Sequence, residues 1–457
     1  MIELRRLLCI LVVAAAGCAQ DPIARNASAG IAPATAGGYA PSALKGPLHS
    51  KITHVVIIVQ ENRSVDDLFN GLPGADTQNY GLNSAGERVK LRQVKMTAPY
   101  DLDHEHRGFV IEDDGGKMDG FNLEHSTDCP GGNCGKRDIR AYGIVPPSEV
   151  QPYFTMAEQY AFADQMFQTN QGPSFPAHQY LLSGTSTISP GSSLRASENP
   201  FTPKQGYTGG CDAPTGSLVL LIDTNGEEDQ QMYPCFDRPA LSDLVDAKSL
   251  TWHYYQAHGG AGLWNGPDAI QHIRNSPEYA TDVVWPSSQI LTDISNGNLS
   301  NVVWVTPTAQ ASDHANITNG SGPDWVASVV NAIGESKYWK NTAIFVTWDD
   351  WGGWYDHVTP PEYNSYELGF RVPLIAISAY TPKGYVSHRK HEFGSILKFT
   401  EKIFGLGSLG TTDTRADDLM DCFDFSQQPR SFTPIPTKRN AQYFLHQPAS
   451  MEDPDDD

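Results

Sequence analysis

Apolar runs of strand length that end in acidic or amide residues constrain the fold of this chain more than any other feature. Residues 54–59, 302–305 and 343–348 form continuous apolar runs with many β-branched side chains. Such runs are typical of strands buried on both faces of a parallel sheet. The polar residues that follow them are, in chain order, Glu61 and Asn62, then Ser312-Asp313-His314, then Asp349 and Asp350.

Segments with helical character lie between the runs, including 64–69, which opens with a Ser suited to cap a helix, and 325–333. Strands that alternate with helices predict an α/β fold, with a central, mostly parallel sheet flanked by helices and with loop insertions. Ligands of such sheets bind beyond the carboxyl ends of the strands. We therefore expect the polar residues at these ends to meet at one edge. A fourth apolar run, 372–378, has no carboxylate at its end.

The acidic and amide side chains at the strand ends predict a metal site. Glu61, Asn62, Asp349 and Asp350 offer oxygen ligands that suit Mg, Ca or Mn and can also hold Zn. Carboxylates clustered at low dielectric repel each other, and a divalent cation compensates for this repulsion. Taken singly, an Asp-Asp or Glu-Asn pair more often forms a solvated turn or a helix cap, so the prediction depends on their shared position.

Ser174 is the candidate nucleophile. It follows Gly172-Pro173 and precedes an apolar stretch of helical character, so we expect it near a helix N-terminus, where backbone N–H groups favour an oxyanion. A hydroxyl needs a base or a metal to remove its proton, and the predicted cation would serve. The alternative is that Ser174 only caps the helix.

Two histidines stand in settings that suit contact with a phosphoryl group. His104 lies in Asp101-Leu-Asp-His-Glu-His106, and His314 follows a predicted strand. An imidazole can donate a hydrogen bond to a phosphoryl oxygen or protonate a leaving group. The spacing leaves open whether His104 or His106 is the active histidine of the first motif.

These residues lie in elements that resemble the bacterial phosphoesterase family of phospholipases C and related acid phosphatases. The resemblance extends over most of the chain after residue 47, in the family's order. The matching elements are 54–64 with Phe69, 101–104, 116–121, 172–176, 312–314, 347–361 and 369–373 with His391 and 395–399.

The resemblance implies an alkaline-phosphatase-like catalytic domain in which Glu61, Asn62, Asp349, Asp350 and Ser174 Oγ hold a metal ion. It further implies that His104 and His314 contact the phosphoryl group, and that a phosphoserine intermediate forms on Ser174. Asp356 and His357 would be supporting residues.

Two features favour a phosphomonoesterase over a phospholipase C. The run 174–178 differs from the Thr-Trp-Pro-Asn-Arg of many phospholipase-like members, and the chain stops shortly after the region of resemblance. A phospholipase C remains the alternative, because four aromatic residues could form a lipid-contacting lip, although packing is the simpler interpretation. These residues are Trp348, Trp351, Trp354 and Tyr355.

Two other functions have less support. A sulfatase is disfavoured because the sequence lacks the motif Cys/Ser-x-Pro-x-Arg, which would supply the nucleophile. A lipid-anchored binding protein without activity is the alternative of another class, but the retained acidic side chains argue against it.

The N-terminus predicts export. Arg5 and Arg6 precede an apolar run that is too short to span a membrane, so residues 1–17 are expected to be a signal peptide. Cys18 ends a lipobox-like sequence and is a candidate lipid anchor of a periplasmic, outer-membrane or secreted protein. Residues 18–47 predict a flexible tether, 48–448 the catalytic domain and 449–457 an acidic, disordered tail.

The net charge of -21 disfavours nucleic acid as a partner. The resemblance implies a small-molecule or lipid phosphate ester as the substrate. An acidic chain must gather positive charge locally to handle phosphate. In an oxidising compartment Cys129 could pair with Cys134, and Cys211 with Cys235, leaving Cys422 as a buried thiol.

Overall fold

A large mixed sheet forms the centre of the chain. The structure is a computed structural model that describes residues 51–126, 138–203 and 205–450. The predicted signal peptide, the tether, Cys18, the pair Cys129 and Cys134 and most of the acidic tail lie outside these ranges. The sheet has eight strands in the order β14 (Val283–Val284), β13 (Trp252–Tyr255), β15 (Val302–Val305), β1 (His54–Gln60), β16 (Thr342–Trp348), β17 (Leu374–Ser378), β6 (Ala161–Ala163) and β18 (Tyr385–Ser387).

The sheet is mostly parallel, as predicted. β1 pairs with β15 and β16 in parallel, and β13 pairs with β14 and β15 in parallel. Only β17 of the eight runs against the others, because it pairs antiparallel with both β16 and β6. The carboxyl end of β17 therefore lies at the opposite edge from those of β1 and β16, which agrees with the missing carboxylate after Ser378.

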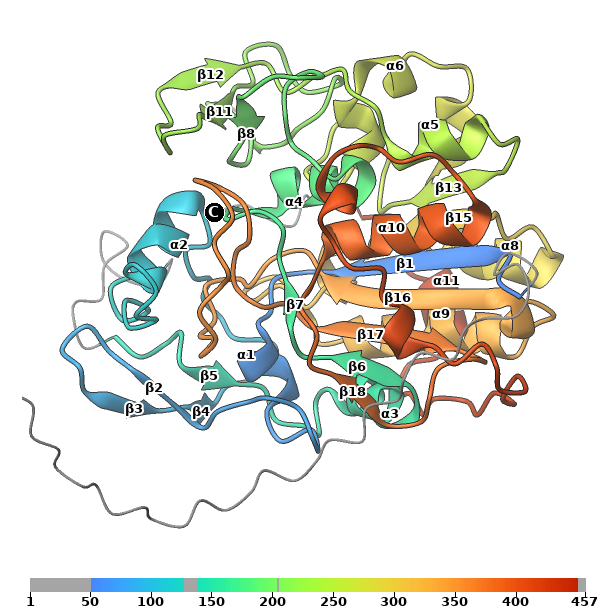
Figure 1. Cartoon of the computed structure of the whole chain (residues 1–457), viewed down its shortest axis with the longest axis horizontal. Helices are drawn as coiled ribbons and strands as arrows, with labels where there is room; N and C mark the ends of the chain where they lie inside the picture. The colour runs from blue at the N-terminus through green and yellow to red at the C-terminus, as the bar shows by residue number, and fades with distance from the viewer. Residues whose placement is uncertain (1–50, 127–137, 204, 451–457) are drawn as a thin grey trace, which may run out of the picture. The chain divides into compact units, whose positions relative to one another are not determined.

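Helices cover the sheet in two groups, which completes the predicted α/β architecture (Figure 1). One group consists of α3 (Gln151–Gln159), α8 (Gln289–Asn296), α9 (Gly322–Gly334) and α11 (Ala441–Leu445). The other consists of α4 (Ser174–Ser183), α5 (Leu241–Asp246) and α10 (Phe393–Phe404). No helix in the described ranges has both the length and the apolar character needed to cross a bilayer.

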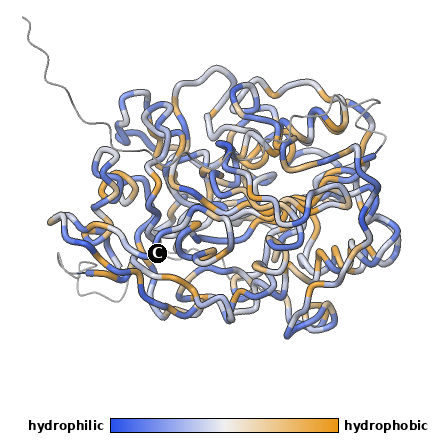
Figure 2. Tube along the Cα trace, turned by 60° about the horizontal axis from the view of Figure 1, so that its bottom comes forward, coloured by the Kyte–Doolittle hydropathy of each residue, from blue (hydrophilic) through white to orange (hydrophobic). Residues whose placement is uncertain are grey.

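The core follows from the apolar runs. Every residue of β16 is buried, as is every residue of β1 after His54, and Figure 2 shows hydrophobic residues gathered along these central strands. A second cluster of buried aromatic residues lies around α2 (His106–Asp113) and includes Trp351, Trp354 and Phe370. Trp348, Trp351, Trp354 and Tyr355 are all buried, so they pack inside the protein and do not form an exposed lip.

Loop insertions carry smaller elements. A three-stranded sheet of β8 (Arg195–Ala196), β11 (Val219–Ile222) and β12 (Gln230–Met232) lies in the segment between α4 and α5. The predicted disulfide between Cys211 and Cys235 closes this segment. Cys422 is buried and outside any disulfide, as predicted.

Candidate active site

The register of the two central strands places Glu61 beside Asp349. Gln60, the last residue of β1, pairs with Trp348, the last residue of β16. The residue after each strand is an acid, Glu61 after β1 and Asp349 after β16. The backbone N–H of Asp349 donates to Gln60 O at 3.0 Å, which continues the strand pairing. Two carboxylates from segments far apart in the sequence therefore lie at the same level of the sheet edge.

The chain reverses direction sharply after each of these strands. Asn62 has φ 58, in the left-handed region that Asn tolerates better than most residues. Gly352 has φ +62, and a Cβ on it would lie 2.4 Å from Asn62 O, so this position requires glycine. The two turns pack against each other, which fixes Asp349 and Asp350 relative to Asn62.

Ser174 faces these acids from the first residue of α4. Its Oγ lies 3.0 Å from Glu61 Oε2 and 3.4 Å from Asp350 Oδ2, and its side chain is fully buried. The N-cap of α4 is Pro173, and Ser174 is the first helical residue, so its hydroxyl does not act as the helix cap. The sequence prediction that a hydroxyl meets the acidic strand ends at a helix N-terminus matches this geometry.

Asn62 connects the acids to His104. Its Nδ2 donates to Asp350 Oδ2 at 3.2 Å and lies 3.0 Å from His104 Nε2. Its Oδ1 is buried and has no hydrogen-bond partner. A buried amide oxygen without a partner costs free energy unless a ligand satisfies it, and a cation would do so.

His104 and His314 both present Nε2 to the site. His104 Nδ1 lies 2.7 Å from Leu102 O and His314 Nδ1 lies 2.6 Å from Ala315 O, so each Nδ1 carries a proton that it donates to a carbonyl. The two rings have centroids 5.8 Å apart. His314 Nε2 lies 3.7 Å from Asp101 Oδ2.

His106 has a different environment. Its Nδ1 lies 2.9 Å from Gln171 O, and burial lowers the pKa of its imidazole. The structure therefore places His104, not His106, next to Asn62.

His178 is a residue of the site that the sequence alone did not indicate. Its Nε2 lies 3.3 Å from Glu61 Oε1 and 3.7 Å from Asp349 Oδ2. It follows Ser174 by four residues on α4, a spacing that puts two side chains on the same helix face. That spacing was the available signal, and it depended on knowing that α4 begins at Ser174.

The tautomer of His178 follows from its other partner. Tyr254 OH donates to Trp264 O at 2.6 Å, so His178 Nδ1, 3.1 Å from the same hydroxyl, must donate to it. In the neutral ring Nε2 then turns a lone pair toward the Glu61 and Asp349 carboxylates. This arrangement is repulsive unless a cation lies between these groups or the ring is protonated.

The donor set therefore fits a divalent cation. Ligand atoms of Glu61, His178 and Asp349 all lie within 4.8 Å of one another, and all three residues are buried. Asp350, with 0% exposure, lies beside them. The structure brings together every residue predicted to hold a metal, and adds an imidazole nitrogen.

The buried acid Asp313 stabilises the loop after β15, the third strand whose end was predicted to carry site residues. Tyr153 OH and Trp348 Nε1 donate to Asp313 Oδ2 at 2.7 and 3.0 Å. Burial raises the pKa of Asp313 to about 7. These contacts fix the loop that carries His314 against the end of β16.

Two further groups of metal-ligand residues are closed by their own hydrogen bonds. Asp356 forms a two-pronged ion pair with Arg371, at 2.8 and 3.0 Å, and His357 Nδ1 lies 2.6 Å from Asp66 Oδ2. A guanidinium inside this group supplies the positive charge that a metal would bring. Asp356 and His357 thus lie in an ion-pair network with Arg371 and Asp66, and their supporting role stays a prediction.

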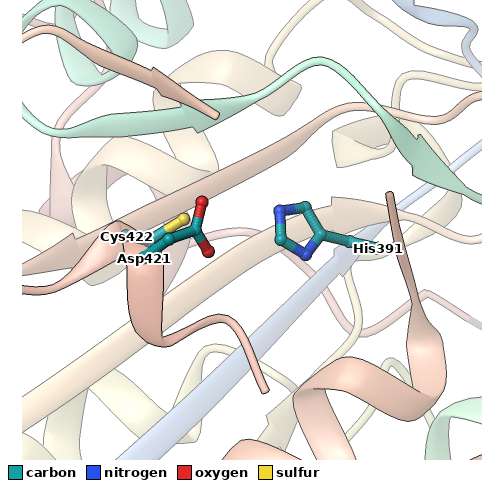
Figure 3. A group of neighbouring side chains, drawn as sticks. All are labelled: His391, Asp421 and Cys422. Carbon is teal, nitrogen blue, oxygen red and sulfur yellow. The ribbon is translucent and has the colours of Figure 1, made fainter. Parts of the chain in front are cut away.

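Figure 3 shows the second group, His391, Asp421 and Cys422. Here Ser387 Oγ lies 3.0 Å from His391 Nε2 and donates to Asp421 Oδ2 at 2.5 Å. Asp417 Oδ1 lies 2.6 Å from His391 Nδ1. Burial raises the pKa of the Cys422 thiol, which keeps it protonated. We interpret this group as a structural link between the strand β18, the start of α10 and the segment around Cys422.

The matched region of the chain contains the whole candidate site. Residues 52–407 match the phosphoesterase family. The chain belongs to this family. The family that the resemblance implied is therefore confirmed.

Several relatives of this chain are phospholipases C by name. Hemolytic phospholipase C of Pseudomonas aeruginosa is 24% identical over 82% of this chain and 56% of that protein. Non-hemolytic phospholipase C of Burkholderia pseudomallei is 28% identical over 84% of this chain and 61% of that protein. Phospholipase C A of Mycobacterium tuberculosis is 22% identical over 84% of this chain and 79% of that protein. The chain thus spans less than two thirds of the length of the first two.

Among solved structures, a protein in the alkaline phosphatase superfamily from Vibrio parahaemolyticus is 10% identical, with a TM-score of 0.38, over 84% of this chain and 73% of that one. A likeness of this degree carries no argument about the site.

Proposed function

We propose that this chain hydrolyses phosphate monoesters through a phosphoserine on Ser174. The contact of Ser174 Oγ with Glu61 Oε2 at 3.0 Å carries this proposal, because it places a hydroxyl against the acids that would hold a divalent cation. When bound, the cation would lower the pKa of the hydroxyl and offset phosphate charge. Glu61, His178 and Asp349, with Asp350 and Asn62, would hold it.

Residues of the chain account for each step of the reaction. The Ser174 hydroxyl loses its proton to a neighbouring carboxylate and Oγ attacks phosphorus, while the bond from phosphorus to the ester oxygen breaks on the opposite side. The leaving oxygen takes a proton from Nε2 of a protonated imidazole, for which His104 and His314 are the candidates. Water then attacks the phosphoserine and returns a proton to this imidazole, and Ser174 Oγ recovers its proton from the carboxylate as free phosphate leaves.

The position of Ser174 on α4 supports the attack. The backbone N–H groups of the first helical turn and the helix dipole favour negative charge at this end of the helix. Ser174 is fully buried, so the reaction would proceed away from bulk water, where electrostatic interactions with the phosphoryl group are strong.

Ser174→Ala tests this proposal, with Ser183→Ala as a matched control at the other end of α4. We expect Ser174→Ala to abolish p-nitrophenyl phosphate hydrolysis and the phosphoserine that mass spectrometry detects after acid quenching. Ser183→Ala should leave both unchanged, because Ser183 Oγ is buried without a hydrogen-bond partner and away from the acids. Full activity of Ser174→Ala would overturn the proposed nucleophile.

A phospholipase C that cleaves head-group phosphodiesters is the second candidate, favoured by the names of the relatives. The buried positions of Trp348, Trp351 and Trp354 remove one feature that would have supported a lipid-contacting lip. Turnover of p-nitrophenyl phosphate compared with p-nitrophenylphosphorylcholine separates the two candidates. Faster turnover of the diester would assign the phospholipase function.

The metal is proposed to be Mn or Zn in preference to Mg or Ca, because His178 adds an imidazole nitrogen to the oxygen ligands. The test is recovery of activity after chelation and re-addition of each ion singly. Recovery with Mg alone would contradict a role for His178 as a ligand.

Export and lipid anchoring at Cys18 are proposals that rest on the sequence of residues 1–18. Metabolic labelling with palmitate compares the unaltered chain with Cys18→Ser. Label on both proteins, or on neither, would contradict lipidation of Cys18.

A further inference from the structure

A cavity of about 440 Å³ lies at the C-terminal end of α4, opposite to Ser174. Segments from several parts of the chain line it, including the loop after α4, the strand β8, the residues before α5 and η6 (Thr412–Thr414). In Figure 1 α4 lies between the small sheet with β8 and the helix α10. At 1.5 Å per residue, the ten residues of α4 separate this cavity from Ser174 by about 15 Å.

The cavity is locally positive in an acidic protein. Its charged lining residues are Arg195, Arg238, Arg415 and Glu367. With Glu392, which pairs with Arg415, the group has three positive and two negative charges and a net of +1. The whole chain carries a net charge of -21. Guanidinium groups are planar forks that match the geometry of phosphate and carboxylate oxygens, so their convergence on one cavity favours an anionic ligand.

Arg238 is a buried cation without an anionic partner. It is 2% exposed and donates to Thr187 O and to Gln179 Oε1, both uncharged, and its Nε is buried without a hydrogen-bond partner. Across the described parts of the chain, no carboxylate lies within 4.0 Å of its guanidinium nitrogens. Burial lowers the pKa of Arg238 to about 9, because desolvation of the charge outweighs the smaller, opposite effect of Tyr180.

Other buried arginines show what is missing at Arg238. Arg63 pairs with Asp67 at 3.1 Å, and Arg371 pairs with Asp356 at 2.8 Å. Buried charges in proteins are normally paired, since an isolated one is costly. A guanidinium that is buried, unpaired and on the wall of a cavity is therefore suited to an anion that enters from solution.

Arg195 and Arg415 complete the positive wall. Both side chains are 18% exposed, and both contact Glu367, with Arg195 Nε at 3.3 Å and Arg415 Nη1 at 2.5 Å. Arg415 also forms a two-pronged ion pair with Glu392, with both bonds at 2.8 Å. Glu367 and Glu392 thus hold these two guanidinium groups in place, and Arg238 supplies the positive charge that stays unpaired. The exposed Thr414 lies at the same cavity, and its hydroxyl donates to Thr411 O at 2.8 Å.

We propose that this cavity is a second anion site, separate from the catalytic centre, that binds a phosphate group. The ligand is free phosphate or a small phosphorylated molecule. The volume lies at the lower end of the range of small-molecule pockets and exceeds the space that one phosphate fills. Arg238 also donates to Gln179, the residue after His178, so a bound anion would contact the helix that carries Ser174 and His178.

Equilibrium dialysis of labelled inorganic phosphate against the purified, metal-loaded full chain tests this site by counting bound phosphate per chain. We expect two phosphates per chain, one in each site, and one fewer in Thr414→Glu, which places a negative charge at the cavity. Arg238→Gln should also lose one, or weaken it by about tenfold to a hundredfold. Thr281→Glu adds the same charge at an exposed position away from the cavity and should lose none.

The same dialysis with labelled glycerol 3-phosphate, in the Ser174→Ala background to prevent turnover, separates the two sources of the phosphate group. Tighter binding of the ester than of phosphate assigns a phosphorylated small molecule, and the reverse assigns free phosphate. Thr414→Glu decides the outcome if Arg238→Gln fails to fold.

An unchanged phosphate count in Thr414→Glu would overturn the second site. Failure of the proposed catalytic function gives a different result. In that case the unaltered chain binds one phosphate, Asp349→Asn leaves the count unchanged, and Thr414→Glu lowers it to zero.

Discussion

Ser174 and His178 lie one helical turn apart on α4 and contact the two oxygens of the same carboxylate, that of Glu61. Ser174 Oγ is 3.0 Å from Glu61 Oε2, and His178 Nε2 is 3.3 Å from Glu61 Oε1. The helix therefore delivers both the proposed nucleophile and a proposed metal ligand to the strand end. Any shift of α4 would move the two groups together relative to Glu61 and Asp349.

Replacing His178 should weaken metal binding more than it destabilises the fold. In His178→Asn we expect metal affinity, measured by titration after chelation, to fall by about tenfold to a hundredfold. Activity at low metal concentration should fall in parallel. His446→Ala, at an exposed position, is the control. Unchanged metal affinity in His178→Asn would show that this imidazole is not a ligand.

His104 and His106 should differ in their kinetic effects. His104→Gln should lower kcat by about 10²- to 10⁴-fold, the usual contribution of a positioned acid or base, with little change in Tm. His106→Gln should act mainly on Tm, because it loses the contact of Nδ1 with Gln171 O. Steady-state kinetics and thermal melts of both variants make the comparison. An equal loss of kcat in the two variants would contradict the assignment of His104.

The carboxyl pair Glu112 and Glu124 should make stability fall as pH rises. Burial, with a smaller effect of Asp103, raises the pKa of Glu112 to about 8, and burial next to Glu112 raises the pKa of Glu124 well above its usual value. The folded state therefore holds more protons than the unfolded state above pH 4.5. Stability is lost between this pH and about 8, by about 1.4 kcal/mol per pH unit for each proton.

Glu112→Gln should flatten this dependence, because the amide oxygen can still accept the hydrogen bond from Trp351 Nε1 that Glu112 Oε2 accepts at 2.7 Å. Urea unfolding between pH 5 and 8 measures the slope. The exposed Glu158→Gln should keep the slope of the unaltered chain. A slope that Glu112→Gln leaves unchanged would refute a raised pKa at this position.

The disulfide between Cys211 and Cys235 should stabilise the chain by about 3 kcal/mol, since it closes a loop with a sequence separation of 24 residues. Urea midpoints of the double variant Cys211→Ser, Cys235→Ser, compared with the unaltered chain, test this. Cys422→Ala controls for the loss of a thiol. Equal midpoints for the double variant and the unaltered chain would contradict the prediction.

The sequence by itself determined the central strands and the chemistry at their ends. Continuous apolar runs such as 54–59 and 343–348 must be buried on both faces, and parallel strands bring their carboxyl ends to one edge. These two facts were enough to place Glu61, Asn62 and Asp349 near one another. The turn at Gly172-Pro173 was enough to place Ser174 at the start of a helix.

Only the tertiary structure decided which residues complete the site. His178 belongs to the site because α4 packs with the face that carries this residue toward Glu61. The path of the loop after Asp101 places His104, and not His106, at the site. The cavity at Arg238 likewise combines segments far apart in the chain. Strand register, helix docking and loop path depend on contacts between distant residues, and such contacts leave no local periodicity in a sequence.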